Sequence, residues 1–529
     1  YFCKELYIIL TMKNIFCFLT LLFSLCANAQ ITERTLPAEW KNLIDGGRFK
    51  DRFLPMPDGK SGENVWGTDS VRLRYVDNGI ENPELSFWGG NILKGKDNKY
   101  HLFVCGWPEN SPKGHMTWPK STVFHTTSDC LSGPYIICDT IGKGHNPEAF
   151  ILKDGRPVVY VIDGYYIADS LNGPWTYSHF TFDKRNRKII EGLSNLTFAK
   201  RSDGSYLMVC RGGGVWISEN GISPYQQVSD RSVYPDVNGE FEDPVIWKDS
   251  LQYHLIVNDW LGKAYTPGIA AHKDGYKENW FKYERMKVFQ DEYGRPIQAN
   301  FAVIDTIKWE DHPNDRHSSK NICIPLNKGL RLSVLNEDTI TAQTKEIKVL
   351  VKAEEGVDFK DFDMKSLRFG SSSDVNYGKG CKAVKRIALG KDLIIVFDGR
   401  NNTIRKDEFA PKLLGKTKKG DLLYGYARLP YVNYHPACLS AAYPMTYDKQ
   451  LELEVKNFGL STSEETDLTV LVNGVKLAEG QVKVLSPYES VKLSLPCINA
   501  AKIDNQTLFT IVYSQHGKEI RKETIQNFD

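Results

Sequence analysis

Four segments in the first 300 residues repeat one pattern, and this repeat limits what the chain can fold into more than any other feature. Each segment holds a short strand, a polar turn that contains Asp with Gly, Asn or Ser, and an apolar strand rich in Tyr, Leu and Val. Such a pattern indicates a β-hairpin. The four copies are WGGNILKGKDNKYHLFV from Trp88, HNPEAFILKDGRPVVYV from His145, SNLTFAKRSDGSYLMV from Ser194 and EDPVIWKDSLQYHLIV from Glu242.

A weaker signal follows each hairpin and reads as a third strand, a turn and an aromatic start to a fourth strand. The copies are FHTTSDCLSGPY (124–135), YIADSLNGPW (166–175), WISENGISPY (216–225) and IAAHKDGYKENW (269–280). Four antiparallel strands that recur about every 50 residues are typical of a propeller blade. A fifth copy is expected near Asn300, so residues 30–335 are predicted to form a five-bladed β-propeller. The alternative is a β-sandwich whose hairpin spacing is accidental.

The composition changes after this region, because all 11 Trp lie between Trp40 and Trp309. Strand-like runs at 346–351, 393–397 and 422–427 predict a β-sandwich-like module over residues 336–445. A cleaner series of five short strands, with the hairpin turn Asn473-Gly474 among them, predicts an immunoglobulin-like β-sandwich over residues 446–529. The expected fold class is therefore all-β, with a five-bladed β-propeller followed by one or two immunoglobulin-like β-sandwich modules.

The first 29 residues are typical of a targeting segment. A charged start at Met12-Lys13 precedes a short apolar run, and Ala27-Asn28-Ala29 fits cleavage after Ala29. Residues 1–11 precede this Met and are interpreted as an upstream extension. We expect a periplasmic or secreted protein without a membrane span, since the apolar run is too short to cross a bilayer. A lipoprotein anchored at Cys26 is the competing interpretation, which the bulky Leu25 disfavours.

The charge balance excludes two classes of partner. Lys and Arg number 67 and Asp and Glu number 65, which gives a net charge of +2 and no electrostatic case for nucleic acid or an anionic membrane. No close pair of Cys suggests a zinc site. We expect no metal site and no cofactor, although a structural cation such as calcium on the propeller axis stays open. The expected partner is an oligosaccharide or polysaccharide.

In a propeller the innermost strands line a central funnel, and their starts reach its mouth. The repeat places five positions there: Trp88-Gly89, His145-Asn146, Ser194-Asn195, Glu242-Asp243 and the region of Gln298–Asn300. The second strands of the first four copies end at Gly106, Asp163, Arg211 and Asp259. Amides, carboxylates and indole rings at a funnel mouth suit a polyhydroxylated ligand.

The pattern resembles the five-bladed glycoside hydrolases of family 43 and their relatives. The likeness covers about half of the chain and is carried by HNPEAFILKDG (145–155), EDPVIWKD (242–249) and ADSLNGPW (168–175). It implies an Asp base, a pKa-tuning Asp and a Glu acid on the first three blades. The spacing to the Asp-Gly turns places these roles at Gly89, Asn146 and Asn195, and none of the three can ionise. The catalytic triad of the family is therefore not carried over to this chain.

Other carboxylates are the catalytic candidates. Hydrolysis of a glycoside needs one carboxyl to protonate the leaving oxygen and another to activate water or attack carbon. Asp243, Glu242 and Glu191 are the candidates, and Asp243 with Glu191 is the favoured pair. Glu242 and Asp243 are neighbours on a strand, so only one of them is expected to face the funnel. The alternative for each is a hydrogen bond that caps a blade.

The substrate-binding candidates are Trp88, His145, Asn146, Glu148, Asp163, Asn195, Arg211 and Asp259. His145 could donate a proton, with a buried structural histidine as the alternative. Arg211 could bind a carboxylate or a sulfate through its planar guanidinium, with an ordinary salt bridge as the alternative.

We expect an exported glycoside hydrolase that acts on a plant or algal polysaccharide fragment by carboxylate acid/base catalysis. A funnel closed at one end suits a chain terminus, so the action is expected to be exo. Two alternatives stay open. One is a non-catalytic, lectin-like propeller, which the substituted positions Gly89, Asn146 and Asn195 favour. The other is a polysaccharide lyase that uses His145 or a Tyr, with Arg211 to neutralise a uronate.

Overall fold

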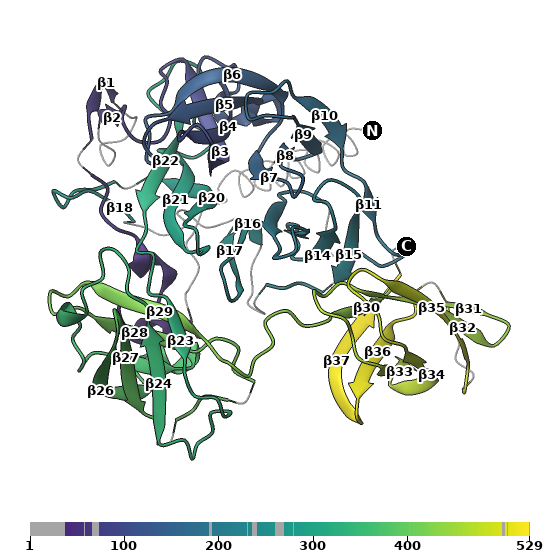
Figure 1. The fold of residues 1–529 in the computed structure, drawn as a ribbon. Coiled ribbons are helices and arrows are strands. Elements are labelled where there is room, and N and C mark those ends of the chain that lie inside the picture. The colour runs from purple at the N-terminus through teal and green to yellow at the C-terminus, as the bar shows by residue number, and fades with distance from the viewer. Residues whose placement is uncertain are drawn as a thin grey trace, which may run out of the picture.

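The structure is a computed structural model that describes residues 37–57, 59–65, 73–189, 193–229, 231–234, 241–259, 269–278, 280–400, 402–405, 407–499, 503–504 and 506–527 (Figure 1). Within these ranges the expected all-β class is confirmed. The only α-helix there is α2 (Ser372–Val375), and the 3₁₀ helices are η1 (Ala38–Asn42), η2 (Phe49–Arg52), η3 (Gly114–Lys120) and η4 (Phe359–Asp361). The predicted targeting segment lies outside the described residues.

None of the helices among the described residues has the length and hydropathy needed to cross a membrane.

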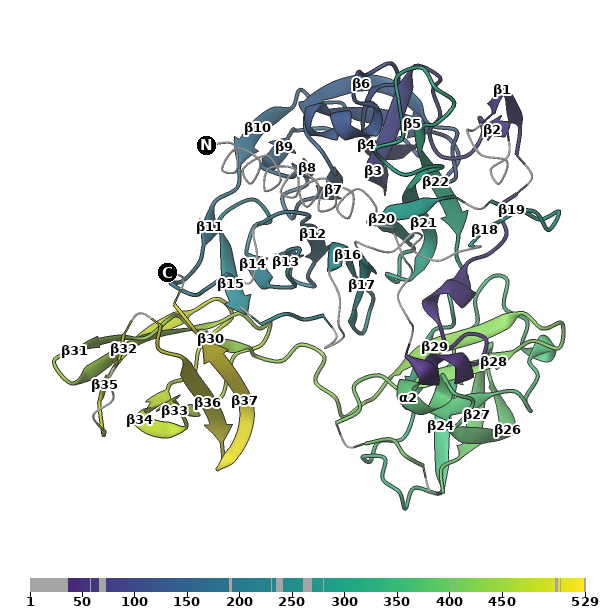
Figure 2. The same ribbon diagram turned by 180° about the vertical axis from the view of Figure 1, so that it is seen from behind.

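The first lobe consists of sheets that follow one another in chain order around a common centre and are antiparallel except where β11 pairs with β15 (Figures 1 and 2). Three are large: β3 (Leu85–Lys94), β4 (Tyr100–Pro108), β5 (Thr122–Ser128), β6 (Ile136–Lys143); then β7 (Glu148–Ile151), β8 (Pro157–Val161), β9 (Gly164–Ile167), β10 (Thr176–His179); then β12 (Thr197–Lys200), β13 (Tyr206–Val209), β14 (Val215–Ser218), β15 (Tyr225–Ser229), β11 (Phe182–Asp183). The smaller ones are β16 (Phe241–Lys248) with β17 (Tyr253–Asp259); β18 (Ala270–Ala271) with β19 (Lys277–Glu278); β20 (Lys282–Gln290), β21 (Pro296–Ile304), β22 (Ser319–Pro325); and β1 (Ser61–Val65) with β2 (Leu73–Tyr75).

The first strands of these sheets lie next to one another. Strand β3 contacts both β7 and β20, and β16 contacts both β12 and β20. Apolar side chains fill the space between neighbouring sheets; one cluster joins Trp88 and Phe103 of the first sheet to Val159 of the second and Ile304 of the last. The contact of β3 with β20 brings the first and last sheets together. The fifth inner strand is therefore β20, whereas Gln298–Asn300 lies on the second strand, β21. The expected start of the fifth repeat near Asn300 is wrong.

A segment ahead of β3 fastens the last sheet to the first. The side chain of Asn78 donates from Nδ2 to the Cys323 carbonyl oxygen at 2.8 Å and accepts from the Cys323 N–H at 3.0 Å. Two residues further along the segment, the Ile80 N–H donates to the Asn321 carbonyl oxygen at 3.2 Å. Both partners belong to β22, so these bonds satisfy backbone groups at its otherwise open edge.

Residues 332–428 form a closed barrel, not the expected β-sandwich. The barrel order is β23 (Leu332–Val334), β24 (Glu346–Val351), β27 (Asp392–Asp398), β26 (Cys381–Leu389), β25 (Arg368–Gly370), β28 (Lys412–Lys416) and β29 (Leu422–Arg428). The physical reason is that the short strand β23 pairs with β24 on one side and runs parallel to β29 on the other. This pairing leaves no free edge, and one apolar core fills the interior.

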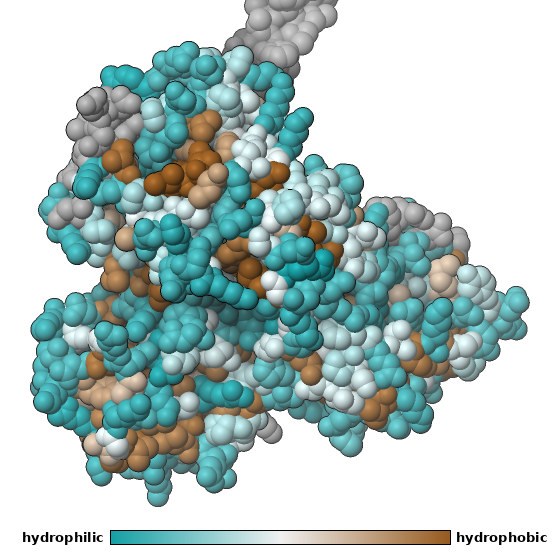
Figure 3. Space-filling view, turned by 45° about the horizontal axis from the view of Figure 1, so that its top comes forward, coloured by the Kyte–Doolittle hydropathy of each residue, from teal (hydrophilic) through white to brown (hydrophobic). Residues whose placement is uncertain are grey.

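The last strands form two sheets over a second core. One sheet holds β30 (Leu439–Ala441), β31 (Met445–Tyr447), β32 (Gln450–Asn457) and β35 (Ser490–Pro496); the other holds β33 (Thr466–Val472), β34 (Val475–Val482), β36 (Phe509–Gln515) and β37 (Lys518–Ile525). Both sheets contribute to one apolar cluster, so this module is a β-sandwich. The barrel and the sandwich form separate lobes beside the first one (Figure 3).

A buried charge cluster holds the sandwich against the first lobe. The Arg187 guanidinium is 1% exposed and lies 3.1 Å from a carboxylate oxygen of Glu523. Arg185 donates from Nη2 to the Ser440 carbonyl oxygen at 2.6 Å. These buried contacts join the loop after β11 to strands β30 and β37, because each buried cation needs a partner that replaces water.

We predict that Asn78→Ala lowers the stability of the first lobe by about 2 kcal/mol, because it leaves two buried backbone groups of Cys323 unpaired. Thermal unfolding followed by circular dichroism measures the effect. Asn172→Ala, at an exposed turn position, is the control and should leave the unfolding midpoint unchanged. Equal midpoints for both variants would contradict the closing role of Asn78.

Candidate functional site

One residue near the start of each inner strand has a left-handed backbone conformation. These residues are Gly89, Asn146, Asn195, Asp243 and Arg285, with φ values of 64°, 55°, 46°, 51° and 50°. Gly, Asn and Asp tolerate this conformation, whereas Arg adopts it rarely. The shared φ identifies five equivalent positions, and four of them are the strand starts that the sequence repeat predicts. The fifth is Arg285.

The left-handed residue also changes which way its neighbours point. Where Asp243 takes φ of 51°, the pairing register between β16 and β17 shifts, and the alternation of side chains along the strand is interrupted. The carboxylates of Glu242 and Asp243 therefore lie together, and Glu284 joins them, with ligand atoms of the three all within 4.8 Å of one another. The expectation that only one of Glu242 and Asp243 faces the centre is wrong.

Cations contact two of these three acids. Arg285 donates from Nη1 to Asp243 Oδ1 at 2.6 Å, and both side chains are buried. Lys282 and Lys308 approach the two oxygens of Glu284 at 2.6 Å and 2.5 Å. Three clustered carboxylates could hold a divalent cation. Here the side chains of Arg285, Lys282 and Lys308 already take the position of such a cation and would repel it.

The pKa values of Glu242 and Glu284 move in opposite directions. Burial, then the charges of Asp243 and Glu284, raise the pKa of Glu242 to about 8, so this carboxyl is protonated at neutral pH. Burial opposes ionisation of Glu284, but the combined charges and hydrogen bonds of Lys308 and Lys282 outweigh it and hold the Glu284 pKa well below its usual range. The cluster therefore pairs a neutral carboxyl, Glu242, with an ionised one, Glu284, which is how acid and base roles are separated in a confined site.

Aromatic rings and histidines form the neighbouring wall. The Trp88 ring is 2% exposed, packs edge-on against His115 at 4.6 Å, and has Lys308 Nζ 5.0 Å from its centroid. His145 Nδ1 lies 2.9 Å from the Ser121 hydroxyl. Burial, then the charges of Arg285 and Lys308, hold the pKa of His145 well below its usual range, so His145 is neutral and does not act as an acid.

Asn146 presents an acceptor beside this wall. Its Oδ1 is buried and has no hydrogen-bond partner among the described residues. A Cβ built on Gly89 would lie 3.5 Å from the same oxygen, so the small residue at position 89 leaves Asn146 room. A ligand hydroxyl could satisfy this oxygen.

Glu148 lies deeper between the inner strands. With Lys287 and Thr197 it forms a buried cluster that we call the plug. Its carboxylate is 2.5 Å from Lys287 Nζ, which also donates to the Thr197 hydroxyl at 3.1 Å. All three residues are buried and come from three different inner strands, β7, β12 and β20. Burial raises the pKa of Glu148 and lowers that of Lys287, while their mutual attraction opposes both shifts. This ion pair holds inner strands together, and both of its members line a cavity of about 540 Å³ between those strands.

The remaining predicted residues are less central. Asn195 is half-buried, and the Arg211 N–H donates to the Ser194 carbonyl oxygen, which places Arg211 beside the same strand start. Asp163 is exposed in the turn between β8 and β9. Asp259 ends β17 opposite Phe241, and Glu191 lies outside the described residues.

The sequence reasoning missed the cations of β20 and the acid between them. A signal was present, because YERMKVFQDEYGRPIQANFAVI has the hairpin form of the other repeats, with its turn at Asp291–Gly294. Aligning Glu284-Arg285 with Glu242-Asp243 would have found the fifth strand start.

No family model and no curated protein matches the chain. Solved structures show a weak likeness. An α-L-arabinofuranosidase from Lactobacillus brevis is 10% identical over 46% of this chain and 92% of its own, with a TM-score of 0.30. An endo-arabinase from Bacteroides thetaiotaomicron is 13% identical, with coverages of 47% and 97% and a TM-score of 0.26.

A glycoside hydrolase family 43 arabinoxylan arabinofuranohydrolase from Bacillus subtilis is 10% identical, with coverages of 85% and 97% and a TM-score of 0.25. Likenesses at these TM-scores carry no argument about this chain, so its own residues must support any function.

We predict that Glu148→Gln destabilises the first lobe by about 3 kcal/mol, because it leaves the buried Lys287 ammonium without its anion. The double variant Glu148→Gln, Lys287→Met removes both charges and should regain most of that loss. Chemical denaturation of the wild type, both single variants and the double variant gives the coupling energy. Additive losses would mean that the pair does not hold the strands together.

Proposed function

We propose that the first lobe is a five-bladed β-propeller and that it hydrolyses glycosidic bonds at the inner-strand starts. In this proposal the propeller lies within residues 30–335, and β16–β17 and β18–β19 together form its fourth blade. The segment 1–29 directs export. The barrel begins at Leu332, before the predicted module of residues 336–445. The sandwich begins at Leu439, before the predicted module of residues 446–529, and we propose that it is an immunoglobulin-like module.

One observation carries the catalytic proposal: Glu242, whose pKa burial and nearby charge raise to about 8, lies with Asp243 and Glu284 so that carboxylate oxygens of all three are within 4.8 Å of one another. Glu242 is half-buried and, among the described residues, accepts no hydrogen bond that would stabilise its charge. A protonated carboxyl of this kind can donate its proton to a leaving oxygen. Asp243, which accepts from the Arg285 guanidinium, serves as the second carboxyl.

The spacing favours a retaining mechanism. Retaining glycosidases hold their carboxyls about 5–5.5 Å apart, and inverting ones need about 6.5–9.5 Å for an intervening water. Glu242 would give its proton to the glycosidic oxygen as that oxygen's bond to the anomeric carbon breaks, and Asp243 would form the new bond to this carbon. Water would then attack the same carbon, lose its proton to the Glu242 carboxylate and release Asp243.

The buried plug supports action at a chain end. Because Glu148 and Lys287 fill the axis below the acid cluster, a polysaccharide cannot thread through the ring. Asn146 offers an open acceptor to a terminal sugar, while the Trp88 ring is covered by protein and supports the site from behind. The proposed substrate is therefore the end of a plant or algal polysaccharide fragment, outside the cytoplasm.

A lectin-like binding function is the second candidate. Arg285 already contacts Asp243, Lys282 and Lys308 already contact Glu284, and Gly89, Asn146 and Asn195 cannot ionise. A site of this kind could bind sugar hydroxyls without cleaving the chain.

We predict that the purified protein releases reducing ends from neutral plant or algal oligosaccharides, and that Glu242→Gln and Asp243→Asn each lower kcat at least 100-fold. Asp163→Asn, an exposed acid outside the cluster, is the matched control and should keep full activity. Proton NMR of the first product formed shows whether its anomeric configuration is retained. Binding without cleavage would support the lectin, and unsaturated products that absorb at about 235 nm would indicate a lyase; either result contradicts the hydrolase.

We predict a basic limit to activity near pH 8. Below this pH Glu242 holds the proton that it must donate, and above it kcat/KM should fall about tenfold per pH unit as the carboxyl ionises. Initial rates between pH 5 and 10 test this. Glu284→Gln removes one of the charges that raise the Glu242 pKa and should move the limit to lower pH.

A further inference from the structure

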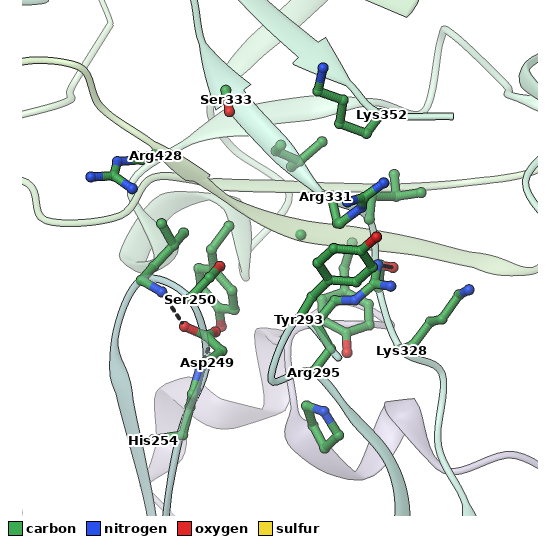
Figure 4. Close-up of a pocket in the computed structure, with 18 of the residues that line it drawn as sticks. Asp249, Ser250, His254, Tyr293, Arg295, Lys328, Arg331, Ser333, Lys352 and Arg428 are labelled. Carbon is green, nitrogen blue, oxygen red and sulfur yellow. Dashed lines mark hydrogen bonds and ion pairs between the residues drawn. The ribbon is translucent and has the colours of Figure 1, made fainter. Parts of the chain in front are cut away.

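A cavity of about 230 Å³ lies where the first lobe meets the barrel. The turns after β16 and β20 form one wall, and the segment leading into β23, together with β29, forms the other. In Figure 4, Asp249 and Ser250 stand on one side, Tyr293 and Arg295 on the other, and Arg331 reaches in beside the Tyr293 ring. This cavity is at the opposite end of the inner strands from Glu242, about 20 Å away along β16 at the usual rise per residue.

Positive charge dominates the lining. Six cationic side chains face four carboxylates that contact them or line the cavity, so, with His254 left out of the count, the wall carries an excess of about two positive charges. The cations are Arg52, Arg295, Lys328, Arg331, Lys352 and Arg428, and the acids are Asp249, Asp291, Glu354 and Asp392.

Glu354 lies near three of these cations, and one of them, Arg295, also pairs with Asp291 at 2.7 Å. Arg295 binds it through both nitrogens at 2.7 Å, in the ideal bidentate geometry. Lys328 Nζ and Arg331 Nε reach the same carboxylate only at 3.8 Å and 3.6 Å, which is beyond hydrogen-bond distance. Lys328 and Arg331 therefore keep donors for another anion.

Arg52 supplies the independent sign of a ligand. Its side chain lines the cavity and is only 7% exposed, yet it has no acidic partner among the described residues. Nη2 donates to the Tyr426 hydroxyl at 3.1 Å, the guanidinium carbon lies 4.2 Å from the Tyr424 ring centroid, and Nε is buried without any partner. A buried guanidinium without an anion is costly, and an anion in this cavity would relieve that cost.

We infer that this cavity binds an anionic group, a carboxylate or a sulfate ester, on a sugar residue. Its volume is several times the roughly 30 Å³ of one water, so it takes more than a bare ion. Hydroxyls of Ser250, Ser333 and Tyr426 stand among the cations and can bond to a sugar ring. The anion part rests on Arg52 and the charge excess; only the carbohydrate part rests on the proposed function.

The site would hold an acidic polysaccharide at the surface while Glu242 acts at the opposite end of the inner strands.

Arg52 variants risk misfolding because the side chain is buried, so the test uses the partly exposed pair Lys328→Gln, Arg331→Gln. Isothermal titration calorimetry at 20 mM salt uses trigalacturonate for the carboxylate, a sulfated carrageenan tetrasaccharide for the sulfate ester, xylotetraose as the neutral control and sodium sulfate alone. Arg386→Gln, exposed on β26 away from the cavity, is the matched charge control.

We expect the wild type to bind at least one acidic oligosaccharide, with affinity that falls as salt rises, and the double variant to bind it at least tenfold more weakly with an unchanged unfolding midpoint. Arg386→Gln should bind like the wild type. Failure of both acidic oligosaccharides to bind, binding of sodium sulfate alone, or equal binding by the double variant would overturn the inference. Glu242→Gln should bind normally, so loss of hydrolysis and loss of this site are told apart.

Discussion

Buried charge between the inner strands is the constraint on which the rest of the first lobe depends. A single strand, β20, supplies Lys282, Arg285 and Lys287, and they contact acids that belong to β20, β16 and β7. Each of these pairs loses its hydration on folding and is stable only when both members are in place. The inner strands are therefore held in register by charge as well as by the apolar layers between the sheets.

The same balance of buried acids and cations distinguishes one acid, Glu242, from the others. Four carboxyls lie on the axis, and the lysines and arginine bind Glu148, Asp243 and Glu284 directly. Glu242 is left without a direct partner among the described residues, and burial, then the charges of Asp243 and Glu284, raise its pKa. The chemistry proposed for the site follows from this single unpaired position in a cluster whose other members are neutralised.

Much of this arrangement could be predicted from the sequence, and the rest fails for identifiable reasons. The hairpin repeat predicts four of the five strand starts, since turn residues and alternating apolar side chains are local signals. The repeat does not show that the left-handed backbone conformation of Asp243 brings the Glu242 side chain onto the same side of the strand. A hydrophobic pattern does not encode the backbone angle φ of a single residue. Barrel closure depends on the three-residue strand β23 and its parallel pairing with β29, a long-range contact that no local period encodes.

The two ends of the inner strands are chemically different because the plug separates them. In the proposed propeller Glu148, Lys287 and Thr197 would close the axis, so a ligand at the Glu242 end and one at the barrel end would not be the same sugar unit passing through. The acid end offers a neutral proton donor, while the barrel end offers cationic side chains in excess of carboxylates. An enzyme with both could cleave a neutral chain end while an acidic branch of the same polysaccharide stays bound, and this requires the barrel to remain fixed to the first lobe. The bidentate Arg295–Glu354 pair provides that attachment, so the residue that fixes the barrel is also the one that leaves Lys328 and Arg331 free to bind an anion.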